Sequence, residues 1–96
     1  MRIRLDRYDI CILINGLNTM REKYSQKVND YVSGLIFRLI DIYDNTNPRR
    51  KARIIFDSNE IHVIRIVLID WRNQFIQEGK PSAAEGVGEL ILKIAG

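Results

Sequence analysis

The sequence predicts a small α+β fold in which a short two-stranded antiparallel ribbon packs on about four helices. The stretch Arg2–Asp6 has the same residue pattern as Arg53–Asp57, and apolar residues at helical spacing follow each copy. With Asp6 placed on Asp57, the aligned apolar pairs are Ile10 with Ile61, Leu13 with Ile64, Leu17 with Leu68, Met20 with Trp71 and Tyr24 with Phe75. After a shift of four residues, 32–39 aligns with 87–94. We therefore expect a tandem duplication of one β-α-α unit, with pseudo-repeats at 1–45 and 49–96.

Length and composition indicate a single domain over residues 1–96. The chain is 46% hydrophobic and 28% charged, as in ordinary globular proteins, and is long enough for a modest core without disulfides or metal. Its only cysteine, Cys11, excludes an internal disulfide and fits a reducing cytoplasm. The longest wholly apolar run, Ile10–Ile14, is far shorter than a membrane span, and no secretory signal is recognised. We expect a cytoplasmic protein with no membrane partner.

The first half is expected to begin with a strand and a helix. Residues 2–5 alternate basic and apolar side chains, which is typical of a strand with one buried face. Asp6 then stops the strand and caps a helix that runs to about Tyr24, with Asp9 in a partial capping box. Gly16 inside this helix costs about 1 kcal/mol relative to alanine. We expect close approach of a neighbouring helix to offset that cost.

A second helix and a linker complete the first half. Ser25 is expected to cap this helix, which carries an apolar face as far as Tyr43. The residues Asp44-Asn45-Thr46-Asn47-Pro48 form a dense turn signal and end the helix. This stretch, about 44–48, is the only credible linker in the chain and separates the two pseudo-repeats.

The second half is expected to repeat the strand and then form two further helices. Asp57 with Glu60 makes a better capping box than the first half has, for a helix at about Ser58 to Gln77. That helix is apolar over most of its circumference, which predicts either the most buried element or a surface for a partner. Gly79 ends it, and Pro81 suits the first turn of a last helix to about Ile94.

The two faces of the ribbon are predicted to differ in chemistry. An isolated two-stranded ribbon is marginal in water, so the helices must cover one face of it. The inward residues are expected to be Ile3, Leu5, Ile54 and Phe56. The outward residues are expected to be Arg2, Arg4, Arg53 and Ile55.

Basic residues gather around the two strands although the net charge is only +3. The candidate nucleic-acid-binding residues are Arg2, Arg4, Arg7, Arg49, Arg50, Lys51 and Arg53. An antiparallel ribbon carrying arginines can enter the DNA major groove and reach base edges. Two simpler interpretations stay open. Water-facing strand arginines protect against edge-to-edge pairing, and the run 49–51 would also suit a non-specific anion patch for RNA or an acidic protein.

The order strand, helix, helix, twice, resembles the ribbon-helix-helix DNA-binding fold with its two protomers fused. The resemblance is one of architecture and implies groove-reading residues at Arg2, Arg4, Arg53 and Ile55. The first helix of each half is longer than in that family. In addition, Lys23-Tyr24-Ser25 stands where the family has a glycine-containing turn.

The helices carry more apolar positions than one core needs, which indicates self-association or a partner groove. The candidate interaction surface comprises Ile12, Ile14, Ile66 and Ile69. The leading functional prediction is a small non-catalytic binding protein, acting as a homodimer, adaptor or inhibitor through this surface. Small basic proteins of this size are common products of phages and other mobile elements. A DNA-binding regulator using the arginine ribbon is the alternative.

No arrangement of residues predicts catalysis, a cofactor or a small-molecule substrate. Cys11 and His62 occupy equivalent places in the two halves, but nothing supplies the third group that a Cys–His pair needs. The carboxylates are scattered singly and are explained as helix caps. We expect no metal site, because ligands at useful spacing are lacking.

Overall fold

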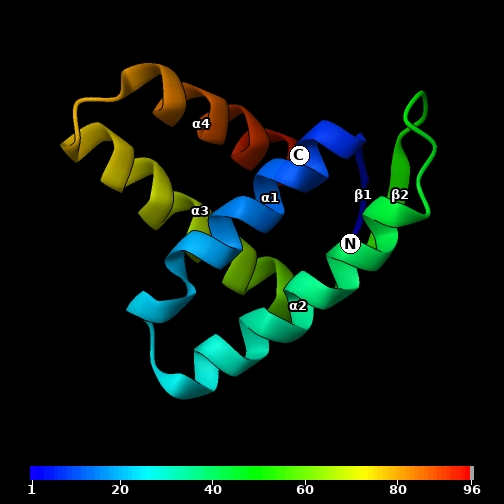
Figure 1. Ribbon diagram of the computed structural model, residues 1–96, viewed down its shortest axis with the longest axis horizontal. Helices are drawn as coiled ribbons and strands as arrows, with labels where there is room; N and C mark the ends of the chain where they lie inside the picture. Colours follow the sequence, from blue (N-terminus) through cyan, green and yellow to red (C-terminus); the bar gives the residue numbers. More distant parts are fainter. Residues whose placement is uncertain (96) are drawn as a thin grey trace.

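The computed structural model describes residues 1–95 as a ribbon and a set of helices (Figure 1). Over these residues the α+β class is confirmed, with four α-helices and one two-stranded antiparallel sheet. The chain order is β1 (Arg2–Leu5), α1 (Arg7–Met20), the 3₁₀ turn η1 (Arg21–Lys23), α2 (Gln26–Asp44), β2 (Ala52–Ile55), α3 (Ser58–Gln77) and α4 (Pro81–Ala95). The ribbon lies at one end of the molecule, far from the turn that joins α3 to α4 (Figure 1).

The register of the ribbon places Arg2 opposite Ile55, Ile3 opposite Ile54, Arg4 opposite Arg53 and Leu5 opposite Ala52. Beyond the strands, Met1 N donates to Phe56 O at 2.7 Å, and Phe56 N donates to Met1 O at 2.9 Å. That reciprocal pair sets the alternation of hydrogen-bonded and non-hydrogen-bonded pairs along the ladder. Arg4 and Arg53 therefore form a non-hydrogen-bonded pair, the kind in which opposite side chains lie closest.

The ribbon buries the predicted face. Ile3, Leu5, Ile54 and Phe56 are at most 5% exposed and join the core, while the outward residues are exposed. The helices contribute the rest of that core through Ile10, Leu13, Leu17, Met20, Val32, Leu35, Ile36, Leu39, Ile61, Ile64, Val67, Leu68, Trp71, Val87, Leu90 and Ile94. Within residues 1–95, no helix combines the length and apolar character that a bilayer crossing requires.

Helices α1 and α3 begin in the same way. Asp6 accepts from the Asp9 backbone N at 2.7 Å, and Asp57 accepts from the Glu60 backbone N at 2.7 Å. Glu60 also accepts from the Asp57 backbone N at 2.9 Å, so the full capping box is confirmed. Asp9 does not reciprocate in this way. Its shorter side chain is buried and instead accepts both of its hydrogen bonds from Lys93 of α4.

The first helix ends earlier than predicted. Residues 21–23 form the 3₁₀ turn η1, and Tyr24 is extended at φ −109° and ψ 173°, so the expectation of a helix to Tyr24 is wrong. Apolar spacing misplaced the end because Tyr24 is half-buried by packing from outside the helix. Its hydroxyl donates to Asp70 of α3. The extended Tyr24 brings Ser25 into place as the N-cap of α2, where it accepts from Val28 N at 3.4 Å.

The connection from α3 to α4 follows the predicted turn chemistry. Gly79 has a φ of 71°, in the left-handed region that glycine enters without a steric penalty. Its N–H donates to Ile76 O at 3.1 Å, and Lys80 N donates to Phe75 O at 2.9 Å. Pro81 is the first residue of α4, where its missing N–H leaves no hydrogen bond unmade.

Candidate nucleic-acid interface

The outward face of the ribbon carries three arginines and one isoleucine, because side chains alternate between the faces of a strand. Arg4 and Arg53 lie directly opposite each other and are both exposed. Like charges in such a pair destabilise a sheet by a few tenths of a kcal/mol to about 1 kcal/mol. This face therefore holds positive charge at a cost to the fold.

A basic hollow adjoins that arginine pair. It has a volume of about 560 Å³, and its lining residues are Arg4, Arg49, Arg50, Lys51 and Arg53. The connection before β2 is shaped by Asn47, whose side chain accepts from Arg49 N at 2.9 Å and whose carbonyl accepts from Arg50 N at 3.0 Å. The ion pairs found across residues 1–95 join Arg38 to Glu60 and Lys93 to Asp9. Within the described residues, none of the five lining residues forms an ion pair, although Lys51 lies close enough to Asp6 to help lower the pKa of that carboxyl.

The structure separates the other two predicted basic residues from the hollow. Arg2 shares the outward face but stands at the opposite end of the ribbon, across from Ile55. The guanidinium of Arg7 lies 4.1 Å from the ring centroid of Tyr43, a cation–π contact that ties the start of α1 to the end of α2. Arg7 is half-buried and therefore has a structural role of its own.

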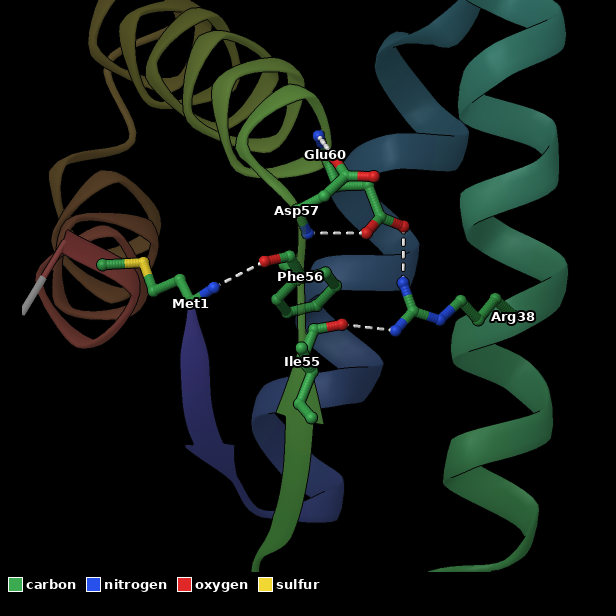
Figure 2. Close-up of polar contacts among 6 residues, drawn as sticks. All are labelled: Met1, Arg38, Ile55, Phe56, Asp57 and Glu60. Atoms are coloured by element: carbon green, nitrogen blue, oxygen red, sulfur yellow. Dashed lines mark hydrogen bonds and ion pairs between the residues drawn. The ribbon is translucent and has the colours of Figure 1, made fainter.

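Arg38 of α2 supports the ribbon from one edge and was missed as a site residue from sequence. One of its guanidinium nitrogens lies 2.5 Å from Glu60 Oε2, and the other donates to Ile55 O at 2.5 Å (Figure 2). Its guanidinium carbon is also 5.4 Å from the centroid of the Phe56 ring. A single side chain thus fixes the end of β2 and the start of α3.

Lys93 of α4 forms the second ion pair, with Asp9 of α1. In the alignment of 32–39 with 87–94, Arg38 is aligned with Lys93. This repeated basic position is the sequence feature that could have identified both residues as parts of the site. Lys93 Nζ donates to both carboxylate oxygens of Asp9, at 2.9 and 3.0 Å. Hydrogen bonding to Asp9 raises the pKa of Lys93 above its ordinary value. Arg38 of α2 therefore pairs with an acid near the start of α3, and Lys93 of α4 pairs with an acid near the start of α1.

The four predicted interaction residues differ in burial. Ile12 and Ile14 are half-buried and pack against the core, whereas Ile66 and Ile69 are 41% and 43% exposed. Ile69 lines an open groove of about 670 Å³ between α3 and α4. The other lining residues are Arg72, Glu85, Gly88, Glu89, Ile91 and Leu92.

Cys11 and His62 are exposed on α1 and α3. The polar neighbour of the Cys11 sulfur is Asn15 of the same helix, at 4.0 Å. His62 instead borders a hollow of about 310 Å³ together with Met1, Ser58, Ile61 and Arg65. The two side chains therefore have separate surroundings.

No family model matches this chain, and neither the curated proteins nor the solved structures yield a significant match.

Proposed function

We propose that this protein binds duplex DNA through the outward face of its ribbon. The observation that carries the proposal is the placement of Arg4 directly opposite Arg53, beside the basic hollow. Such a like-charge pair destabilises the free protein. A bound polyanion relieves the repulsion because it neutralises the two charges. The guanidinium group is also the side chain best suited to paired contacts with phosphate or with guanine in the major groove.

The dimensions of the ribbon favour DNA over double-stranded RNA. Two paired strands lie about 4.8 Å apart, and the major groove of B-form DNA, about 12 Å wide, admits such a ribbon with its side chains. The major groove of A-form RNA is deep and narrow and excludes it. Residues 49–51 beside β2 would then lie against the sugar–phosphate backbone, where lysine and arginine set affinity rather than sequence preference.

We also propose that the two halves arose by duplication and are related by an approximate twofold axis through Ile3 and Ile54. In the alignment of Asp6 with Asp57, Arg2 corresponds to Arg53 and Ile55 corresponds to Arg4. The ribbon pair Arg2–Ile55 therefore corresponds to the pair Arg53–Arg4, and the pair Ile3–Ile54 corresponds to itself. The two N-caps have nearly identical backbone angles, φ −80° and ψ 174° against φ −79° and ψ 174°. The crossed ion pairs of Lys93 and Arg38 add a third correspondence. One chain would thus do what two protomers do in a ribbon-helix-helix dimer.

The test compares two double variants that remove the same charge. Arg4→Ala with Arg53→Ala should abolish specific duplex binding and flatten its salt dependence, by roughly 0.9 in log–log slope for each phosphate that is no longer neutralised. Lys27→Ala with Lys80→Ala changes exposed lysines outside the ribbon and should leave binding nearly intact. Fluorescence anisotropy with a labelled duplex over a range of salt concentrations measures both.

Two results would count against the DNA-binding proposal. One is a native protein that shows no salt-sensitive binding to any duplex at low ionic strength. The other is an equal loss of affinity in both double variants, because that would indicate attraction by net charge alone. The variant with Arg4→Ala and Arg53→Ala should remain folded and be slightly more stable than the native protein, since a like-charge pair is removed. Circular dichroism during urea unfolding checks this.

A second candidate function is protein binding or self-association through α3 and α4. It is favoured by the exposure of Ile66 and Ile69 and by the groove beside Ile91 and Leu92. An exposed apolar surface of this kind is typical of an adaptor, an inhibitor or a dimer. Light scattering at micromolar concentration should then show a species larger than 11.2 kDa. A strict monomer that retains no partner in a pull-down would remove this candidate.

A further inference from the structure

We propose that Ile55 gives the DNA interface a direction by contacting the 5-methyl group of a thymine. The inference rests on the proposed binding of duplex DNA by the ribbon and names what one end of that ribbon recognises. Among the outward ribbon residues, Arg2 aligns with Arg53, and it is the second aligned pair in which the two halves differ. Where one half has Arg4 on the outward face, the other has Ile55.

The two ends of the outward face have different chemistry. One end carries Arg4 opposite Arg53, next to the basic hollow. The other end carries a single arginine, Arg2, opposite Ile55. A ligand with exact twofold symmetry would present the same groups to both ends. The ribbon is therefore better matched to a non-palindromic duplex, bound in one orientation.

Ile55 is 62% exposed and is the one apolar side chain on the outward face of the strands. It makes no hydrogen bond through its side chain, so it cannot read the donors and acceptors of a base edge. Among the groups exposed in the major groove, the thymine methyl is the one that an aliphatic side chain matches. Contact with it would remove apolar surface of both partners from water.

The backbone at Ile55 is held from the side of the helices. Arg38 donates to Ile55 O and is itself held by Glu60, as the close-up in Figure 2 shows. The corresponding Lys93 has one ammonium group and directs it to Asp9. A planar guanidinium can serve two acceptors at fixed geometry, which a lysine does less well. The Ile55 end of the ribbon is thus fixed in position before any ligand binds, and Arg38 is its positioning residue.

The experiment begins by selecting a preferred duplex from a random pool with the native protein. Each thymine of that duplex is then replaced in turn by deoxyuridine, which lacks only the methyl group. We expect one position at which the replacement weakens binding by about fourfold, the factor that corresponds to one buried methylene-sized group. Ile55→Ala should bind thymine and deoxyuridine duplexes equally at that position. Ile66→Ala, which truncates an exposed isoleucine on α3, should keep the full discrimination.

Arg38→Lys provides a second readout. It retains a positive charge for Glu60 but should release Ile55 O, so the thymine discrimination should fall while the salt dependence stays unchanged. A selected site that is palindromic, or discrimination that survives in Ile55→Ala, overturns the inference and leaves duplex binding intact. Failure of the native protein to bind any duplex overturns both proposals. Preferential binding of double-stranded RNA also overturns both, since uracil carries no methyl group at this position.

Discussion

Gly16 of α1 lies so close to Trp71 of α3 that a β-carbon at residue 16 would be 2.6 Å from the indole Cε3 atom. The glycine in the middle of a helix is therefore explained by a helix crossing, as its position in the sequence suggested. Trp71 is buried, and Phe75 packs beside it with the ring centroids 5.1 Å apart. The indole ring is confined and has little room to move away.

Gly16→Ala should lower the free energy of unfolding. Overpacking a confined core position typically costs about 1–3 kcal/mol, which exceeds the gain of about 1 kcal/mol in helix propensity. Gly34→Ala is the matched control, because Gly34 is an exposed helical glycine with nothing within 4 Å of its added β-carbon. That control should gain up to about 1 kcal/mol. Urea unfolding midpoints compare them, and equal gains in the two variants would contradict the close crossing.

Lys93→Met should destabilise the fold by about 1–3 kcal/mol, because it leaves the buried carboxylate of Asp9 without its donor. The double variant Asp9→Leu with Lys93→Met should recover part of that loss, since it removes the buried carboxylate together with its donor. A double-mutant cycle by urea unfolding gives the interaction energy. Strictly additive losses would show that the two residues do not depend on each other.

The stability of the fold should decrease in acid partly through Asp6. The backbone N–H of Asp9 is the main cause that lowers the pKa of Asp6 below its ordinary 3.8. The unfolded chain takes up this proton at higher pH, so the contribution is present above pH 3.8 and is lost as the pH falls through the folded value.

Asp6→Asn keeps a capping side chain but cannot titrate, so its stability should fall less steeply below that pH. Asp6→Ala should instead lose about 1 kcal/mol at neutral pH. Urea midpoints measured across the acid range distinguish the variants. An Asp6→Asn profile parallel to that of the native protein would exclude Asp6 as a contributor.

Tyr24 should make the fold sensitive to alkali. Burial, followed by the hydrogen bond to Asp70, raises the pKa of Tyr24 above its ordinary 10.0. Its contribution is therefore complete below pH 10.0 and is lost as the pH rises towards the folded value.

Tyr24→Phe should cost about 1 kcal/mol at neutral pH, because the hydrogen bond to Asp70 is removed. It should also flatten the alkaline decline, because the group that must ionise is gone. Thermal or urea unfolding followed from neutral to alkaline pH measures both effects. An alkaline decline unchanged by this substitution would place its cause elsewhere in the molecule.

Local rules predicted much of the fold. Alternation of basic and apolar residues in 2–5 identified which strand face is buried, because side chains point to opposite sides at each step. Asp57 with Glu60 marked the start of α3, and Gly79 marked its end. These features depend on residues within three or four positions of one another, so they can be predicted without knowing the fold.

The supports of the candidate interface were not predicted in the same way. Arg38 binds the carbonyl of Ile55, which is 17 residues away in the sequence, and Lys93 binds Asp9, which is 84 residues away. The stacking of Arg7 on Tyr43 was likewise not predicted. The end of α1 was misplaced because Tyr24 is half-buried by a contact with α3, which periodicity alone does not distinguish from a helical position.

The sequence by itself determined the strands, the helix starts and the outward placement of the ribbon arginines, since each follows from spacing along the chain. Only the tertiary structure decided that Arg4 faces Arg53 in register, that residues 49–51 join them around one hollow, and that Arg38 fixes Ile55. The physical reason is that strand register and long-range hydrogen bonds depend on how the helices pack on the ribbon. That packing brings together residues whose spacing in the chain carries no signal of their contact.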